Sequence, residues 1–370
     1  MVEMLENHWM RKGWDSVQLI TVLVSAAGSP TMPGQIKCFR NNGERNIRIV
    51  GTDMADDDTI KQMVDVYYRV SPVNDERYVD EILEICKREK VDIYFPNISA
   101  EVTKVSKRIK EFESIKVKVS ISDASTVAVL NNKLSVYTKL KEHGIKIPEF
   151  YAVSNVDDFL KGCKDLCFPK RPVCLKMLEE SGSRGVRIID NQRNRYQIFA
   201  HEKPNSFFTS YEDMLSVLNN AESIEPMMLI PYFPGNEYTV DLLADHGKIL
   251  YIVGRENVVS LMSIAQKSIV AKIESAYELC SEIVKLFDYT GNIGIDFLKD
   301  ENGHPWIMDI NPRLTATVSV IAAAGVNLPY LRVKQLLEEK MPKCDVQYGT
   351  TMIRRYAEYM TSVSGECIVF

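Results

Sequence analysis

Two aspartates and an asparagine near residue 300 have the residue types and the spacing of a metal site. They lie in the segment DFLKDENGHPWIMDINPR, which runs from Asp296 to Arg313. Its Asn302-Gly303 pair is typical of a two-residue turn between antiparallel strands. Counting back from that turn places Asp296 directly opposite Asp309 on one face of a hairpin, and Asn311 points the same way. Because facing carboxylates repel each other, this pair calls for a counter-charge.

A magnesium ion fits this set of oxygen donors. Magnesium uses one or two protein carboxylates and leaves its other positions to water and substrate phosphates. Arg313 follows the strand, where its guanidinium suits an oxyanion or a phosphoryl group in transfer. The alternative is an ordinary hairpin in which the acids are solvated and Arg313 pairs with one of them. The remainder of the chain decides between these two interpretations.

Length and composition are those of a globular chain with two or three domains. The chain has 370 residues, 26% of them charged, and a formal net charge of -5. The sequence has no basic block, so we expect neither nucleic acid nor a membrane surface as principal partner. No apolar run approaches the roughly 18 residues that span a bilayer, and residues 1–16 lack an apolar signal core. The eight cysteines have irregular spacings typical of reduced thiols, which favours a cytoplasmic location.

Residues 17–120 alternate between strand and helix patterns. This alternation predicts a doubly wound parallel sheet with right-handed crossovers. Asp53 closes the second predicted strand, where a dinucleotide fold places the acid that holds a ribose. However, the first turn, AAGSPTMPG, lacks the G-x-G-x-x-G fingerprint, so a structural or acceptor-substrate domain is favoured over NAD binding. The five strands are expected at 17–25, 46–53, 66–70, 92–96 and 116–120, after a leader of uncertain order at residues 1–16.

Two lysines and a glycine-serine segment are candidates for binding phosphate. Lys133 starts a predicted helix that ends near Gly144, and Lys176 lies near the end of the strand VCLKM. Residues 181–185, SGSRG, follow that strand, and their N–H groups could cradle phosphate oxygens. This segment is not a P-loop, because the G-K-[ST] ending and the following helix are absent, and taken alone it is a turn. The segment consists of Ser181, Gly182, Ser183, Arg184 and Gly185.

The later strands supply candidates for a nucleotide base, a ribose and a substrate. The apolar strand with Met228, Leu229 and Ile230 could flank a flat base. Glu237, in PGNEYTVD, could hold ribose hydroxyls or could be an ordinary edge-strand carboxylate. Arg255 is expected at the far end of a strand over 248–255, where it could bind a carboxylate. Helices are expected at 276–287, 318–324 and 330–340, and a last hairpin at 348–359.

Taken in order, five motifs resemble the ATP-grasp superfamily, most closely its carbamoyl-phosphate-synthase-like branch. The motifs are Lys133, Lys176 with SGSRGV, PGNEYTVD, GIDF and DINPR. The resemblance covers residues 17–340 and implies an α/β and α+β protein, in which a Rossmann-like sheet precedes a two-lobed ATP-grasp fold. The implied domains are a Rossmann-like domain at 17–120, a small lobe with its linker at 121–190, a large lobe at 191–340, and a C-terminal hairpin and tail at 341–370.

The resemblance also implies a role for each matching residue. Lys133 and Lys176 belong to the ATP phosphates and the adenine side, and residues 181–185 to the loop that closes over the phosphates. Glu237 is implied as the ribose ligand, Asp296, Asp309 and Asn311 as ligands of one or two Mg²⁺ ions, with Mn²⁺ as a substitute, and Arg313 as the residue beside the transferred phosphoryl group. The sequence departs from the family at Ile230-Pro231, which replaces a hinge glutamate, and at Asp309, which replaces a second glutamate.

The expected function is that of an ATP-dependent ligase. Such an enzyme transfers the γ-phosphoryl group of ATP to a small-molecule carboxylate, and an amine or similar nucleophile then attacks the acyl phosphate. We expect Arg255 to bind the carboxylate and a homodimer as the default assembly. The alternatives are bicarbonate activation as in carbamoyl phosphate synthase, a simple phosphotransferase, a nucleotide-binding module without turnover, and a Rossmann-type oxidoreductase.

Overall fold

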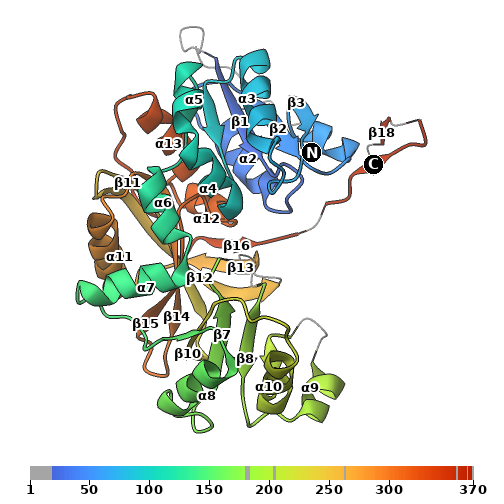
Figure 1. Ribbon diagram of the computed structural model, residues 1–370. Helices are drawn as coiled ribbons and strands as arrows, with labels where there is room; N and C mark the ends of the chain where they lie inside the picture. The colour runs from blue at the N-terminus through green and yellow to red at the C-terminus, as the bar shows by residue number, and fades with distance from the viewer. Residues whose placement is uncertain are drawn as a thin grey trace. The chain divides into compact units, whose positions relative to one another are not determined.

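The structure, a computed structural model, describes residues 19–179, 184–202, 206–261, 264–355, 357–364 and 366–368. The chain divides into two units (Figure 1). The first comprises residues 1–121, 316–345 and 356–370, and the second comprises residues 122–315 and 346–355. The leader expected at residues 1–16 lies outside the described residues.

A five-stranded parallel sheet forms the centre of the first unit. The strand order is β3-β2-β1-β4-β5, so the chain winds to both sides of β1, as the sequence predicts for a doubly wound sheet. Every residue of β1 is buried, including Thr21 and Ser25, as is typical of the central strand of a parallel sheet. The strands are β1 (Ile20–Ser25), β2 (Ile47–Asp53), β3 (Val66–Arg69), β4 (Ile93–Phe95) and β5 (Lys118–Val119).

Helices from both ends of the chain complete the first unit. Helices α12 and α13 contact α2 in the first unit, whereas the sequence predicts them in the large lobe. Arg45, which is buried, donates to the Tyr330 hydroxyl in the first turn of α13 at 2.9 Å and to the Glu339 carboxylate just after the helix at 2.6 Å. The helices are α2 (Met32–Arg40), η1 (Asp58–Gln62), α3 (Tyr78–Glu89), α4 (Ser99–Lys107), α5 (Ile109–Ser114), α12 (Val318–Ala323) and α13 (Leu328–Leu336). Strands β17 (Met360–Thr361) and β18 (Cys367–Ile368) form a small pair.

The second unit begins with two helices and a mixed five-stranded sheet, which we call the small lobe. Its strand order is β6-β10-β7-β8-β9. The sheet therefore continues to Pro231, beyond residue 190, which is the end of this lobe predicted from the sequence. The elements are α6 (Ala124–Leu130), α7 (Lys133–Glu142), β6 (Tyr151–Val153), α8 (Val156–Asp165), β7 (Val173–Met177), β8 (Val186–Ile189), α9 (Arg195–His201), β9 (Phe208–Thr209), α10 (Tyr211–Asn219) and β10 (Met227–Pro231).

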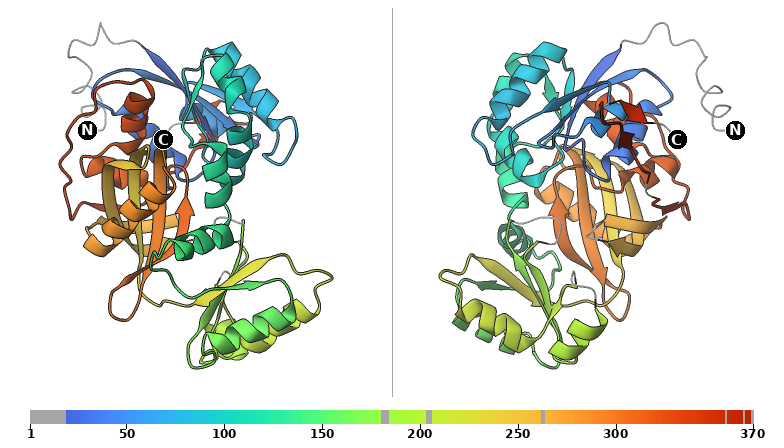
Figure 2. Two further views of the ribbon diagram at one scale, coloured as in Figure 1. Left: turned by 60° about the vertical axis from the view of Figure 1, so that its left-hand side comes forward. Right: turned by 90° about the vertical axis from the view of Figure 1, so that its right-hand side faces the viewer.

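The large lobe of the second unit is a six-stranded antiparallel sheet with α11 (Glu274–Leu286) on one face (Figures 1 and 2). Its order is β15-β14-β11-β12-β13-β16. Residues 351–353 pair with β13 at the edge of this sheet, and do not form the local hairpin expected over 348–359. The strands are β11 (Glu237–Asp245), β12 (Lys248–Leu261), β13 (Ile264–Val270), β14 (Gly291–Lys299), β15 (Pro305–Asn311) and β16 (Thr351–Ile353).

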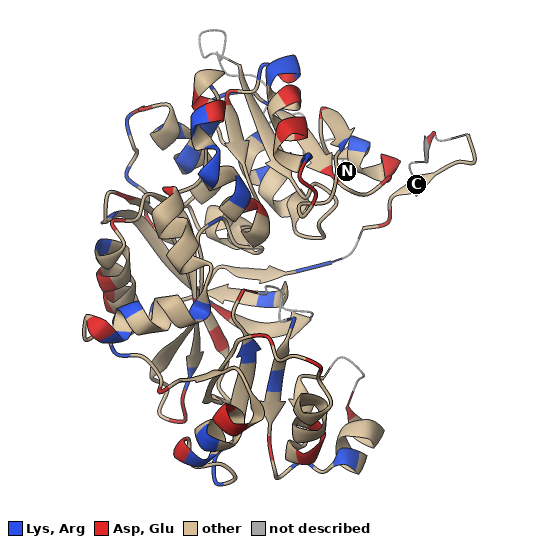
Figure 3. Cartoon of the chain, in the orientation of Figure 1, with Lys and Arg blue, Asp and Glu red and all other residues tan. Residues whose placement is uncertain are grey.

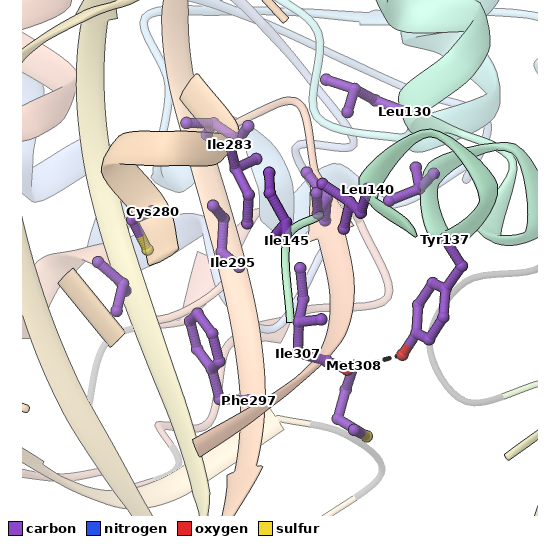
Figure 4. Close-up of a cluster of buried hydrophobic side chains, with 14 of the residues drawn as sticks. Leu130, Tyr137, Leu140, Ile145, Cys280, Ile283, Ile295, Phe297, Ile307 and Met308 are labelled. Atoms are coloured by element: carbon purple, nitrogen blue, oxygen red, sulfur yellow. Dashed lines mark hydrogen bonds between the residues drawn. The ribbon is translucent and has the colours of Figure 1, made fainter. Parts of the chain in front are cut away.

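The two faces of the large sheet differ in polarity because side chains alternate along a strand. In β11 the buried apolar residues Tyr238, Val240 and Leu242 alternate with Glu237, Thr239 and Asp241. The apolar face packs against α11 and, with α7, forms one cluster of buried side chains (Figure 4). The opposite face carries the polar residues, which are those of the candidate site.

Charged residues of both signs occur on the described elements of both units (Figure 3). Lys and Arg residues are interspersed with Asp and Glu residues over both units (Figure 3), in keeping with the absence of a basic block in the sequence. No described helix has both the length and the apolar character needed to cross a bilayer.

Candidate active site

The hairpin of β14 and β15 places Asp296 opposite Asp309, as the sequence predicts. The turn differs from the prediction, because Asp300 N–H donates to the His304 carbonyl at 3.0 Å and leaves a three-residue loop, 301–303. Gly303 has φ of +77°, the left-handed conformation that such a loop requires of its last residue. The Asp300 carboxylate closes the loop by accepting hydrogen bonds from the Asn302 and His304 N–H groups at 2.9 Å and from Trp306 Nε1 at 3.0 Å.

A β-bulge compensates for the longer loop. Below the bulge, Phe297 pairs with Ile307, and above it Asp296 pairs with Asp309, so Met308 is the extra residue of β15. Ile307 and Ile310 are both buried on the apolar face although they are three residues apart, which a regular strand does not allow. The bulge therefore restores the pairing that a two-residue turn would have given.

Asp296 is in an environment that disfavours its charge. Desolvation by the surrounding protein, together with the negative charges of Glu237 and then Asp309, raises the pKa of the Asp296 carboxyl to about 7. The Thr239 hydroxyl donates to Asp296 Oδ1 at 2.7 Å, which favours the carboxylate and partly opposes this rise. Three acids on one face thus create the electrostatic demand that a divalent cation would meet.

Asn311 and Arg313 extend the polar face beyond the two aspartates. Asn311 Nδ2 donates to Asp296 Oδ2 at 2.9 Å, and Arg313 Nη2 donates to Asn311 Oδ1 at 3.3 Å. Coordination of a metal by Asn311 Oδ1 therefore requires the amide to turn. Desolvation lowers the pKa of Arg313, while the charges of Asp296 and Asp309 raise it. The side chains proposed for the metal and the phosphoryl group thus lie together.

Arg255 is not at the end of a strand, contrary to the prediction. Strand β12 continues to Leu261, and Arg255 lies opposite Thr239 in its middle, with 3% of its surface exposed. Its Nε donates to Asp241 Oδ2 at 2.8 Å, and its other nitrogens donate to Asn257 and to Thr315. A guanidinium held by three protein groups suits the positioning of the sheet's polar side chains better than the capture of a substrate.

Gly294 is required by the close approach of Thr315. A Cβ atom at Gly294 would lie 2.1 Å from Thr315 Cγ2. The Thr315 hydroxyl donates to Asp241 Oδ1 at 2.5 Å and accepts from Arg255 Nη2 at 3.2 Å. The glycine of the GIDF motif therefore lets the segment after Arg313 close over the sheet next to the two aspartates.

Two lysines of the small lobe approach the same residues of β15. Asn132 caps α7 by accepting a hydrogen bond from Ser135 N–H, so that Lys133 is the first residue of the helix. Lys133 Nζ lies 3.7 Å from Asp309 Oδ2. Lys176, on β7, places its Nζ 3.9 Å from Met308 Sδ. The structure thus brings Lys133 to the Asp309 carboxylate and Lys176 to Met308 of the bulge.

Beyond Leu229, the side of β10 that faces β6 has no pairing strand among the described residues, and we call it the free edge of β10. Tyr232 N–H donates to the Pro172 carbonyl at 3.0 Å, on the side of β7. Because peptide groups alternate along a strand, the Pro231 carbonyl and the Phe233 N–H point to the other side. On that side β6 ends at Tyr151, opposite Leu229. Proline lacks an N–H group, but the Pro231 carbonyl points to this edge and can accept a hydrogen bond there.

The side chains of β10 divide between the two faces of the small lobe. Met228 and Ile230 belong to the cluster shared with the large lobe, and these two remain candidates for lining a base. Leu229 packs on the opposite face, where its side chain meets α8 at Gly162. Leu229 therefore contributes only its backbone to the face predicted for the nucleotide.

The predicted phosphate loop is described only in part. Ser181, Gly182 and Ser183 lie outside the described residues. Gly185 has φ of +64°, and its carbonyl accepts a hydrogen bond from Met177 N–H at 3.1 Å. A Cβ atom at Gly185 would lie 2.0 Å from Met177 Cγ, so this end of the loop needs glycine. Arg184 is exposed beside it.

The donor set suits a metal that is completed by a ligand. Among the described residues, no group of three or more His, Cys, Asp or Glu side chains is arranged to hold an ion. Two carboxylates and an amide oxygen fit magnesium, which accepts few protein ligands and takes substrate phosphates. They do not fit a structural zinc site, which needs four ligands rich in sulfur or nitrogen.

The structure adds four residues to the predicted site. Thr239 and Asn257 bind Asp296 and Glu237, with Asn257 Nδ2 donating to Glu237 Oε1 at 2.8 Å. Met308 contacts Lys176, and the Phe233 N–H belongs to the free edge of β10. The alternation of polar residues in EYTVDLLAD was a signal for Thr239, whereas Asn257 and Met308 depend on a long strand and a bulge that no local pattern marks.

Two family models match parts of the chain. Residues 223–357 match a model described as ATP-grasp in the biosynthetic pathway with Ter operon, and residues 22–120 match the PylC-like N-terminal domain. The first match contains β11 to β15 with the aspartate pair, and the second contains β2 to β5 and most of β1 of the parallel sheet.

Named relatives agree with these matches. A [butirosin acyl-carrier protein]–L-glutamate ligase from Niallia circulans is 20% identical over 65% of this chain and 56% of its own length. A D-alanine–D-alanine ligase from Pelotomaculum thermopropionicum is 22% identical over 72% of this chain and 86% of its own length. The chain spans 62% of the length of a further curated relative and 56% of the length of the glutamate ligase. Both shares are less than two thirds.

The fold is also that of a solved synthetase. N5-carboxyaminoimidazole synthetase from Staphylococcus aureus, in complex with ADP, has a TM-score of 0.64 and 14% identity, and the match covers 89% of this chain and 80% of that one. The chain therefore has the two-lobed ATP-grasp fold. Its first unit is similar to the PylC-like N-terminal domain, and its large lobe to the ATP-grasp domain of the Ter-operon biosynthetic type.

Proposed function

We propose that this protein is an ATP-dependent ligase that activates a carboxylate as an acyl phosphate and joins it to an amine. The observation that carries the proposal is the pairing of Asp296 with Asp309, with Lys133 Nζ at 3.7 Å from Asp309. In an ATP-grasp fold this is an arrangement for Mg-ATP. The named ligases and the ADP-bound synthetase support the reaction class.

In this proposal the adenine binds at the free edge of β10. The 6-amino group of adenine is a donor and its N1 atom is an acceptor, which matches the Pro231 carbonyl and the Phe233 N–H. Met228 and Ile230 line the base, and Glu237 holds the ribose. Lys133 and Lys176 neutralise phosphate charge, together with the N–H groups of residues 181–185.

The residues of the polar face carry the transfer. Asp296, Asp309 and Asn311 hold one or two magnesium ions, which when bound neutralise the triphosphate and orient its γ-phosphoryl group. Arg313 binds the oxygens of that group and the substrate carboxylate beside it. Glu237, Thr239 and Asn257 fix the position of Asp296. Positioning and charge neutralisation are the protein's contribution, because no covalent nucleophile is required.

The substrates are two small molecules, one that carries the carboxylate and one that carries the amine. A cytoplasmic location is part of the proposal, because the seven cysteines whose side chains are described are free thiols. Assembly as a homodimer and use of Mn²⁺ remain predictions.

The test is ADP release by the purified chain with pooled amino acids and bicarbonate, with hydroxylamine added to trap acyl phosphates. The proposal predicts ADP release that needs a carboxylate, a hydroxamate when hydroxylamine is present, and loss of both in Asp309→Asn. ADP formed without a second nucleophile identifies a phosphotransferase. Turnover that Asp309→Asn leaves unchanged contradicts the proposed site.

A further inference from the structure

The bulge at Met308 decides which face of the sheet Asp309 occupies. Below the bulge, Phe297 pairs with Ile307 and Leu298 with Trp306. If that register continued, Asp296 would pair with Met308, and Asp309 would pair with Ile295 on the apolar face. A shift of one residue moves a side chain to the other face of a sheet. The carboxylate pair therefore exists only while the bulge is in place.

Tyr137 of α7 holds the residue next to the bulge. Its hydroxyl donates to the Ile307 carbonyl at 2.6 Å, within the cluster drawn in Figure 4. Tyr137 is 1% exposed, and burial raises the pKa of its hydroxyl well above the usual range, so it stays a donor. Asp300 and His304 form a hydrogen-bonded pair, so by alternation the Ile307 carbonyl points away from β14. Because β15 is the edge strand of the sheet, a partner for this carbonyl must come from outside the sheet.

The same helix also carries the lysine of the site. Lys133 and Tyr137 are four residues apart, so they lie on one side of α7. Lys133 reaches Asp309 while Tyr137 reaches Ile307, two residues earlier in β15. One turn of α7 thus contacts β15 on both sides of Met308. Met308 itself is buried and contacts Lys176 of β7.

We propose that Tyr137 is a positioning residue for the metal site, which fixes the bulge at Met308 and so holds Asp309 opposite Asp296. This inference rests on the proposed function, because it assigns a role in binding the metal. It adds that the small lobe controls the geometry of the large-lobe carboxylates through one buried hydroxyl. Nucleotide that engages Lys133 and Lys176 would act on the same three residues of β15.

The test compares Tyr137→Phe with Tyr289→Phe. Tyr289 is a matched control, because its buried hydroxyl also donates to a carbonyl of the large sheet, that of Asn292 at 2.8 Å, away from the bulge. Mn²⁺ binding to the complex with a non-hydrolysable ATP analogue is measured by electron paramagnetic resonance. Hydrogen exchange of peptides from residues 305–312 is followed in parallel.

Tyr137→Phe is expected to weaken Mn²⁺ binding about tenfold, which is the effect of one buried hydrogen bond that orients a ligand. Exchange at residues 305–312 should quicken, and the concentration of Mg²⁺ needed for turnover should rise more than the KM for ATP. Tyr289→Phe should lose thermal stability to a similar extent but keep its Mn²⁺ affinity.

Two outcomes separate the inference from the function. If wild-type Mn²⁺ binding depends on Asp309 but Tyr137→Phe matches the wild type, or if both tyrosine variants lose affinity equally, the positioning role is refuted and the metal site stands. If Asp309→Asn binds Mn²⁺ as tightly as the wild type does, the proposed function fails, whatever the result for Tyr137→Phe.

Discussion

Thr239 donates a hydrogen bond from its hydroxyl to Asp296 Oδ1 over 2.7 Å, in the row of the sheet that also contains Asp309 and Arg255. This bond links the Asp296 carboxylate to β11, an interior strand of the sheet. The electrostatic properties of the site follow from this row, because each member changes the cost of charge on Asp296.

The raised pKa of Asp296 predicts metal binding that depends on pH. A cation binds the carboxylate and not the acid, so Mn²⁺ affinity should rise about tenfold per pH unit up to pH 7 and level off above it. A titration of Mn²⁺ affinity between pH 5.5 and 8.5 checks this. An affinity that is flat over this range would show that Asp296 is already charged throughout.

The same shift predicts that Asp296→Asn stabilises the metal-free protein at pH 8. The pKa of Asp296 is about 7 in the folded state and 3.8 as an ordinary side chain, so between these values the folded state binds more protons. The contribution of Asp296 to the free energy of unfolding therefore falls as pH rises from about 4 to about 7. Denaturation in urea at pH 5 and pH 8 should show a gain for the variant that is larger at pH 8.

The buried pair of Arg255 and Asp241 predicts a loss of stability on substitution, more than a change in KM. Removal of the guanidinium leaves the Asp241 charge buried, since both side chains are at most 4% exposed. Arg255→Met should cost about 3–5 kcal/mol in the free energy of unfolding. Adding Asp241→Leu should recover most of that loss. A stable Arg255→Met protein with only a raised KM for the carboxylate would restore the role expected from the sequence.

The contact between Gly294 and Thr315 predicts a rescue by a second substitution. Gly294→Ala should destabilise the protein by about 1–3 kcal/mol, because the new Cβ overlaps Thr315 Cγ2. Thr315→Ser removes that methyl group and keeps the hydroxyl that bonds Asp241. The double variant should therefore be more stable than Gly294→Ala alone in thermal melts. An equal or lower melting temperature would show that the strain has another source.

The aspartate pair was predictable because local signals fix it. Asn302-Gly303 marked the turn and the alternation of β14 marked the face, so Asp296 and Asp309 were paired correctly. The loop has one residue more than predicted, and the bulge at Met308 cancels that difference. The sign of the bulge in the sequence is that two apolar residues of one face, Ile307 and Ile310, are three residues apart instead of two or four. It was ambiguous because Pro305 to Ile310 also has ordinary strand character.

The remaining differences come from contacts that are distant in sequence. The sequence predicts a strand end at Arg255, whereas the bond of Arg255 to Asp241 is fixed by the pairing of β11 with β12, which continues past residue 255. Residues 351–353 join β13 across about 80 residues of chain, which no local pattern indicates. Likewise, α12 and α13 pack against α2 in the first unit, and Arg45 bonds Tyr330 of α13 and Glu339 just beyond it.

Mn²⁺ binding to Asp309→Asn in the presence of a non-hydrolysable ATP analogue tests the central claim most directly. Asp245→Asn serves as the control, because Asp245 is an exposed aspartate at the end of β11 in the same sheet. The account predicts that Asp309→Asn lowers Mn²⁺ affinity by at least about tenfold, while Asp245→Asn binds as the wild type does. Equal affinity in all three proteins would contradict the claim that Asp296 and Asp309 hold the metal of Mg-ATP.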